Sequence, residues 1–147
     1  YDIHGLETII FRYFNVYGER QPTRGQYAPV VGLFQRQLTE GVPMTIVGDG
    51  TQMRDFTYVG DVVEANIKAA LTENKEAFGE IINIGTGVNY NMFDLVRMIG
   101  GEDADWKHIP PRPGEVKISK ANIEKAKNIL NWTPQVSLEG WLNAQKV

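Results

Sequence analysis

Short apolar blocks along the chain follow two spacings, one typical of strands and one typical of helices. Blocks rich in β-branched and aromatic residues without a helical period predict strands, and they fall at residues 6–16, 44–47, 54–59, 80–84 and 106–109. Blocks with apolar residues at helical spacing predict helices at about 27–40, 61–71, 91–99 and 123–130. Because strands and helices follow one another in turn, the pattern predicts an α/β fold with a mixed sheet.

Polar and flexible residues mark where several of these helices should begin and end. Asp61 and Asn91 begin two of the periodic segments, and their short side chains can accept hydrogen bonds from the free N–H groups of a helix start. Gly41 and Gly100 are predicted to end two helices. Gly5 likewise predicts the tail of a helix that begins upstream, so we expect this chain to be a fragment.

Composition narrows the classes of function. The 147 residues are 42% hydrophobic and 22% charged, a globular composition that suits one domain. The net charge of −3 is spread along the chain, which argues against a basic face for nucleic acid. Cysteine is absent and His4 and His108 belong to no metal-spaced motif, so we expect no metal site. No apolar run approaches the length of a membrane span, and we expect a cytoplasmic protein without a membrane partner.

Two arginines stand where an anionic ligand could be bound. Arg54 follows the turn at residues 48–51, and Arg112 lies in the stiff segment Pro-Pro-Arg-Pro-Gly at residues 110–114. A guanidinium group that is held in place by its neighbours matches the geometry of a phosphate. The alternative interpretation is that each arginine is an exposed loop residue or a member of a structural ion pair.

Other glycine and acidic residues are interpreted structurally. Gly85-Thr86-Gly87 lies between a strand and a helix, but it lacks the third glycine of a dinucleotide-binding turn and the Gly-Lys-Thr end of a phosphate loop. Asp49, Asp55 and Asp61 are not interpreted as a carboxylate cluster, because Asp49 lies in a predicted turn and Asp61 is predicted to cap a helix.

Five motifs resemble, in order, those of the extended short-chain dehydrogenase/reductase family, which includes NAD-dependent sugar-nucleotide epimerases and dehydratases. They are Arg-Tyr-Phe-Asn-Val-Tyr-Gly-Glu-Arg-Gln at 12–21, Gly-Asp-Gly-Thr-Gln-Met-Arg-Asp-Phe-Thr-Tyr-Val at 48–59, Asn-Ile-Gly-Thr-Gly at 83–87, Pro-Arg-Pro-Gly-Glu at 111–115 and Ala-Lys-Asn-Ile-Leu-Asn-Trp-Thr-Pro at 126–134. Together they cover much of the chain, and their common order makes the resemblance specific.

The resemblance implies an α/β architecture, the C-terminal part of an extended Rossmann-type fold. This part would comprise the last sheet strands and the small substrate-binding subdomain. Residues 1–18 would end the dinucleotide-binding domain, with a helix tail and a strand, and residues 19–147 would mainly bind the nucleotide-sugar. Residues 80–87 would return to the Rossmann sheet.

The resemblance also implies roles for individual residues. It places Tyr13 beside the nicotinamide of NAD, and it gives Asn15 a hydrogen bond to the nucleotide diphosphate. Arg54 and Arg112 resemble the two diphosphate-binding arginines, and Glu115 stands where the family's acid holds the ribose hydroxyls. The implied substrate-binding residues are Phe14, Asn15, Pro29, Thr45, Val47, Arg54, Arg112, Glu115 and Ser119.

Further details of the resemblance concern the base and the sugar. Pro29 and residues 44–47 match segments whose backbone frames the base. Ser119 stands where epimerases restricted to plain hexoses tend to carry a bulky Tyr, so a sugar with an acetamido group would have room. The family commonly has Asp where this chain has Glu115 and Asn122. The longer Glu can still accept both hydroxyls, and Asn122 is predicted to cap a helix.

The catalytic machinery is expected upstream of Tyr1. The family's glycine-rich fingerprint and its Tyr-x-x-x-Lys pair have no counterpart in this sequence, so no catalytic residue is assigned and the chain alone is expected to be inactive. The resemblance implies a whole enzyme that is a homodimeric UDP-sugar 4-epimerase, with NAD bound mainly by the upstream part. A dehydratase or decarboxylase of the same family, and a non-catalytic nucleotide-sugar-binding module, remain open alternatives.

Overall fold

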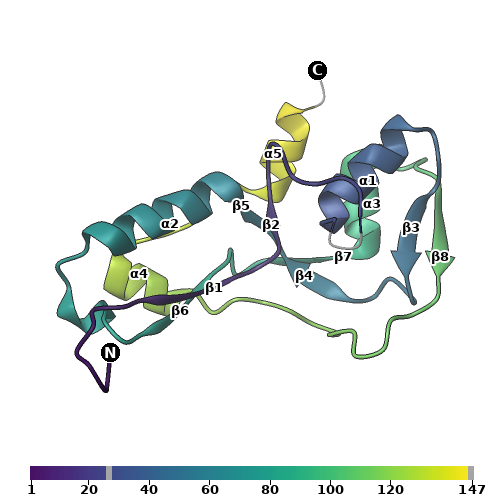
Figure 1. Ribbon diagram of the computed structural model, residues 1–147. Coiled ribbons are helices and arrows are strands. Elements are labelled where there is room, and N and C mark those ends of the chain that lie inside the picture. Colours follow the sequence, from purple (N-terminus) through teal and green to yellow (C-terminus); the bar gives the residue numbers. More distant parts are fainter. Residues whose placement is uncertain (26–27, 146–147) are drawn as a thin grey trace.

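The computed structural model describes residues 1–25 and 28–145, in which strands and helices follow one another (Figure 1). The strands are β1 (Ile10–Tyr13), β2 (Val16–Tyr17), β3 (Met44–Val47), β4 (Met53–Asp55), β5 (Thr57–Tyr58), β6 (Ile81–Ile84), β7 (Asn89–Asn91) and β8 (Trp106–Ile109). The helices are α1 (Val30–Thr39), α2 (Val59–Leu71), α3 (Met92–Gly100), α4 (Glu124–Leu130) and α5 (Leu138–Ala144), with a 3-10 turn, η1, at Lys75–Ala77. The predicted α/β class is confirmed.

The strands pair two by two, and each pair joins segments that are far apart in the sequence. β1 lies parallel to β6, β2 to β5 and β3 to β8, whereas β4 and β7 are antiparallel. The predicted mixture of strand directions is therefore present. The pairing of β6 with β1 brings residues 80–87 beside the first strand, while the domain boundary at residue 18 stays a prediction.

Two hydrophobic cores lie at opposite ends of the molecule (Figure 1). In one, α2 and α4 cover β1 and β6 around the fully buried Trp132, whose indole N–H donates to the carbonyl of Asp61 at 3.0 Å. In the other, α1 packs against β3 and α3, and α5 packs against α3, with Phe34 and Leu95 fully buried. β4 and the segment that follows β8 run between the two ends.

The strands predicted at residues 6–16 and 54–59 are each interrupted once, so both predictions were partly wrong. β1 ends at Tyr13 and β2 begins at Val16, and β4 ends at Asp55 and β5 begins at Thr57. At each break the chain changes its partner strand, because β1 and β4 pair with β6 and β7 whereas β2 and β5 pair with each other. Local β propensity cannot reveal such an exchange, since it depends on distant strands.

The predicted helix ends met with mixed results. Asn91 is the N-cap of α3, where its side chain accepts from the N–H groups of Phe93 and Asp94, as predicted. Asp61 is not a cap: α2 begins at Val59, and the buried Asp61 carboxylate accepts from the N–H groups of Gln135 and Val136, both at 3.1 Å. Because the Asp61 carboxylate accepts hydrogen bonds from these two distant N–H groups, it does not cap its own helix.

Three further points concern where helices α1 and α4 begin and whether α5 was predicted. The start predicted at residue 27 lies outside the described residues, and α1 is described from Val30. Asn122 accepts from the N–H of Glu124 at 3.0 Å, although the residue in the N-cap position of α4 is Ile123. α5 was not predicted. Within the described residues no helix combines the length and the apolar character needed to cross a membrane.

Candidate functional site

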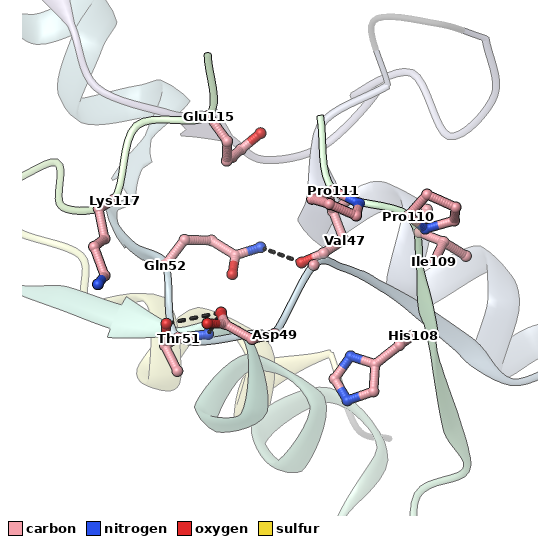
Figure 2. Close-up of a pocket in the computed structure, with 11 residues that line it drawn as sticks. Val47, Asp49, Thr51, Gln52, His108, Ile109, Pro110, Pro111, Glu115 and Lys117 are labelled. Atoms are coloured by element: carbon pink, nitrogen blue, oxygen red, sulfur yellow. Dashed lines mark hydrogen bonds between the residues drawn. The ribbon is translucent and has the colours of Figure 1, made fainter. Parts of the chain in front are cut away.

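A cavity of about 870 Å³ opens between the turn that follows β3 and the segment that follows β8 (Figure 2). One part of its wall is apolar, with Val47, Ile109, Pro110 and Pro111, and the rest is polar. The polar lining residues are Asp49, Thr51, Gln52, His108, Glu115 and Lys117. A mostly apolar hollow with a few convergent polar groups is typical of a small-molecule site.

The parallel pair of β3 and β8 fixes the two sides of the cavity. The N–H of Gly48 donates to the carbonyl of Ile109 at 2.9 Å, which extends the pairing to the cavity mouth. Gly50 is buried with φ of 78°, and a Cβ there would lie 2.7 Å from the ring of Phe93. Glycine is therefore required at position 50 for both its conformation and the close approach of the ring.

Asp49 gives this cavity an acidic floor. Its Oδ1 atom accepts hydrogen bonds from the backbone N–H and the hydroxyl of Thr51, at 3.0 and 2.8 Å. These bonds lower the pKa of Asp49 below its ordinary value, because they favour the charged form. Asp49 and Glu115 outnumber Lys117 among the charged residues that line the cavity of about 870 Å³, so the cavity suits the neutral part of a nucleotide better than its diphosphate.

Arg54 and Glu115 form an ion pair at the edge of this cavity. Arg54 Nη2 donates to Glu115 Oε1, and Arg54 Nη1 donates to the carbonyl of Met53 at 2.9 Å. The arginine side chain is 14% exposed and the glutamate side chain 35% exposed. The guanidinium is thus held on one side by the protein while the carboxylate remains accessible to a ligand.

The segment that carries Glu115 is bound to β4 by its backbone. The N–H of Met53 donates to the carbonyl of Lys117 at 2.8 Å, and the N–H of Ser119 donates to the carbonyl of Met53 at 2.9 Å. Two parts of the chain that were separate motifs in the sequence therefore act as adjacent strands. The structure therefore brings the segment of Glu115 and Ser119 beside Arg54.

Asp55 is the central hydrogen-bond acceptor beside these residues. It is fully buried, and its carboxylate accepts from the N–H and hydroxyl of Thr86 and from the N–H groups of Gly87 and Ala121, at distances of 2.7 to 3.0 Å. The sequence predicted no role for Asp55. Its partners are 31 to 66 residues away, so the local sequence could not identify them.

A second cavity, of about 220 Å³, lies at the start of α1 and includes Asn15 and Pro29. Asn15 has φ of 22°, and its amide nitrogen donates to the carbonyl of Asp55 at 2.6 Å. α1 begins after Pro29, and no side chain among residues 1–25 and 28–145 caps its first N–H groups. Free N–H groups and the helix dipole favour an anion at such a place.

The remaining candidate residues lie apart from the first cavity. The Tyr13 hydroxyl donates to Asn66 of α2 at 3.0 Å, on the face of β1 opposite to half-buried Phe14. Thr45 is hydrogen-bonded to Gln37 of α1 through both its N–H and its hydroxyl. Arg112 is exposed and forms no ion pair with any described residue. In the described part of the chain no cluster of His, Asp and Glu could hold a metal ion.

Comparison with known proteins gives one family and a consistent set of relatives. The model of the NAD dependent epimerase/dehydratase family matches residues 2–85. A UDP-glucose 4-epimerase of Mycolicibacterium smegmatis is 37% identical over 84% of this chain and 39% of its own length. A UDP-N-acetyl-alpha-D-glucosaminuronate decarboxylase of Bacillus cytotoxicus is 34% identical, over 95% of this chain and 45% of its own.

Solved structures agree with this result. A UDP-glucose 4-epimerase of Thermotoga maritima, determined with UDP-glucose, is 40% identical and superposes with a TM-score of 0.85 over 96% of this chain and 45% of that protein. A UDP-glucuronic acid 4-epimerase of Bacillus cereus, in complex with UDP-glucuronic acid and NAD, is 39% identical with a TM-score of 0.82, over 92% and 43%. The chain spans less than half the length of each of these proteins.

Proposed function

Because this chain belongs to the NAD dependent epimerase/dehydratase family, we propose that it forms the nucleotide-sugar-binding part of a UDP-sugar 4-epimerase. The observation that carries the proposal is the Arg54–Glu115 pair, which stands between the cavity of about 870 Å³ and the residues around Asn15. The guanidinium of Arg54 can donate two hydrogen bonds to a diphosphate, and the accessible carboxylate of Glu115 can accept hydrogen bonds from the hydroxyls of the attached ribose.

The two ends of the site differ in charge, and this difference gives the nucleotide a direction. The base and ribose lie in the first cavity, where Glu115 accepts hydrogen bonds from the ribose hydroxyls and the apolar wall covers the base. The diphosphate lies on Arg54 and Arg112, close to Asn15 and the start of α1. The ionised Asp49 opposes the reverse placement.

Arg112 has to move or become ordered for this role, because it is exposed on its loop. The prolines on both sides of it limit the conformations of that loop, so the side chain needs only a small adjustment to meet a phosphate. Only one amide hydrogen of Asn15 is used by Asp55, which leaves the second hydrogen for a phosphate oxygen.

This chain contributes little to NAD. The cofactor, when bound, accepts and returns a hydride at a sugar carbon. The carboxyl ends of the parallel strands β1 and β6 lie at one edge, which is where open α/β sheets bind their ligands. Tyr13 is the last residue of β1, and Phe14 follows it. We expect the remaining cofactor contacts and the catalytic residues in the part of a longer enzyme that precedes Tyr1, and we expect these 147 residues alone to show no turnover.

A decarboxylase or dehydratase is the second candidate, because relatives named as decarboxylases match the chain over the same range at 34% identity. A binding module without catalysis is a third. All three would hold the nucleotide in the same way, so the sugar chemistry must be measured separately.

The test combines binding with product analysis. Calorimetry on the whole enzyme should show UDP and UDP-glucose binding, with little affinity for free glucose. Incubation of UDP-glucose and of UDP-glucuronic acid, followed by chromatography of the sugars, separates epimerisation from loss of carbon dioxide. The absence of UDP binding would contradict the proposal, whereas binding without any product would favour the non-catalytic module.

A further inference from the structure

Gln52 is a buried amide that faces the first cavity. The residue is 8% exposed, it links the turn at residues 48–51 to β4, and it lines the cavity. Its Nε2 atom donates to the carbonyl of Val47 at 2.9 Å. Among residues 1–25 and 28–145, no group donates a hydrogen bond to its Oε1 atom.

Val47 determines which way the amide points. A backbone carbonyl only accepts hydrogen bonds, so the amide nitrogen must face it and the amide oxygen must face away. A rotated amide would set two acceptors against each other in a buried place, which is costly. Figure 2 shows Gln52 extended toward Val47, with its oxygen turned away from that residue. The cavity therefore contains an acceptor with a fixed direction.

We propose that Gln52 determines the base specificity of the site by accepting the ring N–H of a uracil. The inference rests on the proposed function, which puts the base in this cavity. Uracil carries an N–H donor at N3, whereas cytosine has a lone pair at the same position, and such differences at the base edge are read by hydrogen bonds. Cytosine N3 would face Oε1 as a second acceptor, and neither group could donate.

The backbone around Gln52 strengthens this selection. The N–H of Gly48 is already used by Ile109, and the hydroxyl and N–H of Thr51 are used by Asp49. These three donors are thus occupied within the protein, whereas the Oε1 atom of Gln52 faces the cavity as an acceptor. A base that supplies its own donor is favoured.

The test compares UDP with CDP on the whole enzyme by calorimetry. The wild-type enzyme should bind UDP at least about tenfold more tightly than CDP, because a site built for one hydrogen bond rejects an analogue without it. Gln52→Met keeps the length of the side chain and removes both polar groups. It should weaken UDP by about tenfold and leave CDP within about twofold, so that the preference disappears.

Gln35→Met is the matched control, because Gln35 lies on α1 outside this cavity, and it should keep the preference for UDP. If Gln52→Met keeps the preference, or weakens both nucleotides equally, Gln52 only supports the turn and the inference is overturned, while the proposed function stands. If the wild-type enzyme binds neither nucleotide, the proposed function fails and the inference fails with it.

A measurement on the unaltered protein covers the case in which Gln52→Met does not fold. UDP methylated at N3 has lost the donor, so it should bind about tenfold or more weakly than UDP. Binding within about twofold of UDP would overturn the role of Gln52.

Discussion

Arg54 shows how much the setting of one side chain contributes to its role. The guanidinium is 14% exposed, and Glu115 and the carbonyl of Met53 fix its direction. A charge that is already ordered loses little conformational freedom when a ligand arrives. The cost of removing it should therefore appear mainly in ligand binding.

In the whole enzyme, Arg54→Ala and Arg112→Ala should each weaken UDP-sugar binding by about 2–4 kcal/mol, since each leaves a desolvated diphosphate without a charged partner. NAD content should not change. Calorimetry with UDP gives the affinity. Arg97→Ala is the control, because Arg97 forms an exposed ion pair with Glu102 on the surface of α3. If both site variants bind UDP within about twofold of the wild type, Arg54 and Arg112 do not bind the diphosphate.

Asp55 should matter more for stability than any other carboxylate of the site. Asp55→Ala leaves three backbone N–H groups, those of Thr86, Gly87 and Ala121, without an acceptor, and we expect the free energy of unfolding to fall by about 3–5 kcal/mol. Asp49→Ala removes two bonds at an exposed turn and should cost about 1 kcal/mol or less. Urea denaturation measures both losses, and similar losses for the two variants would contradict this account.

Ser119 leads to a prediction about which sugars the enzyme accepts. Ser119 is half-buried beside β4, and we expect the whole enzyme to accept UDP-N-acetyl sugars at least as well as plain UDP-hexoses. Ser119→Tyr should lower kcat/KM for the acetylated substrates by about tenfold or more and spare the others. Equal losses on both substrate classes would show that Ser119 does not line the pocket for the acetamido group.

The sequence identified Arg54, Glu115 and Ser119 only through their resemblance to known motifs, and the structure then showed them side by side. The sequence alone did not reveal that Asp55 and Gln52 are important, although both are buried in the structure. Their roles depend on partners that fold against them from other motifs, and a local pattern contains no record of those partners.

At the scale of elements, α5 is held in place by a carboxylate from a distant loop. Glu19 accepts a hydrogen bond from the indole N–H of Trp141 at 2.8 Å and from the hydroxyl of Tyr58 at 3.0 Å. The pKa of Glu19 lies below 4.5, and the hydrogen bond from Trp141 is the largest cause of this shift. The bond to Glu19 also raises the pKa of Tyr58. The loop that follows β2, the end of β5 and α5 thus meet at this carboxylate.

This arrangement predicts a dependence of stability on acid. A carboxyl whose pKa is lower in the folded state than in the unfolded state stabilises the fold fully above the unfolded pKa, and the contribution disappears as pH falls through the folded pKa. Thermal melts should therefore lose stability below the usual glutamate value of 4.5. Glu19→Gln should show a smaller change over the same range, and parallel curves for the two proteins would exclude Glu19 as the cause.

Elements with a clear apolar pattern were predictable, including the short strands β3, β6 and β8, whereas α5 and the separate strand β2 were not. α2 and α3 have sustained apolar spacing, and the capping box at Asn91 fixes the start of α3. α5 has seven residues and β2 has two, and so short a segment is stabilised by its contacts more than by its own propensity. Trp141 and Glu19 are 122 residues apart, which places the stabilising contact beyond any local window.

At the scale of the whole molecule, β1 and β6 form an open pair. Within the described residues neither strand has a partner on its other edge. Ile10 and Ile81 face each other in register and are 52% and 42% exposed, and Leu6 is 66% exposed. Unpaired edges beside exposed apolar side chains favour association with other chains.

The 147-residue chain alone should therefore self-associate. Sedimentation velocity should show sizes that grow with protein concentration, and Ile81→Lys should reduce the growth by placing a charge on the open face. Val88→Lys is the control, because Val88 is similarly exposed, at 51%, but lies outside this strand pair. A single monomeric species with a cooperative melt would contradict the expectation.

The pairing of distant strands also has a consequence for the order of events during synthesis. Ile10 pairs with Ile81, and Met44 pairs with Trp106. During synthesis, β1 and β3 therefore leave the ribosome long before the strands with which they pair have been made. Loop closure over such spans slows folding relative to a helical bundle of the same size. During that interval the strands are exposed to other nascent chains, and a chaperone that shields β1 until β6 emerges should raise the yield of native protein.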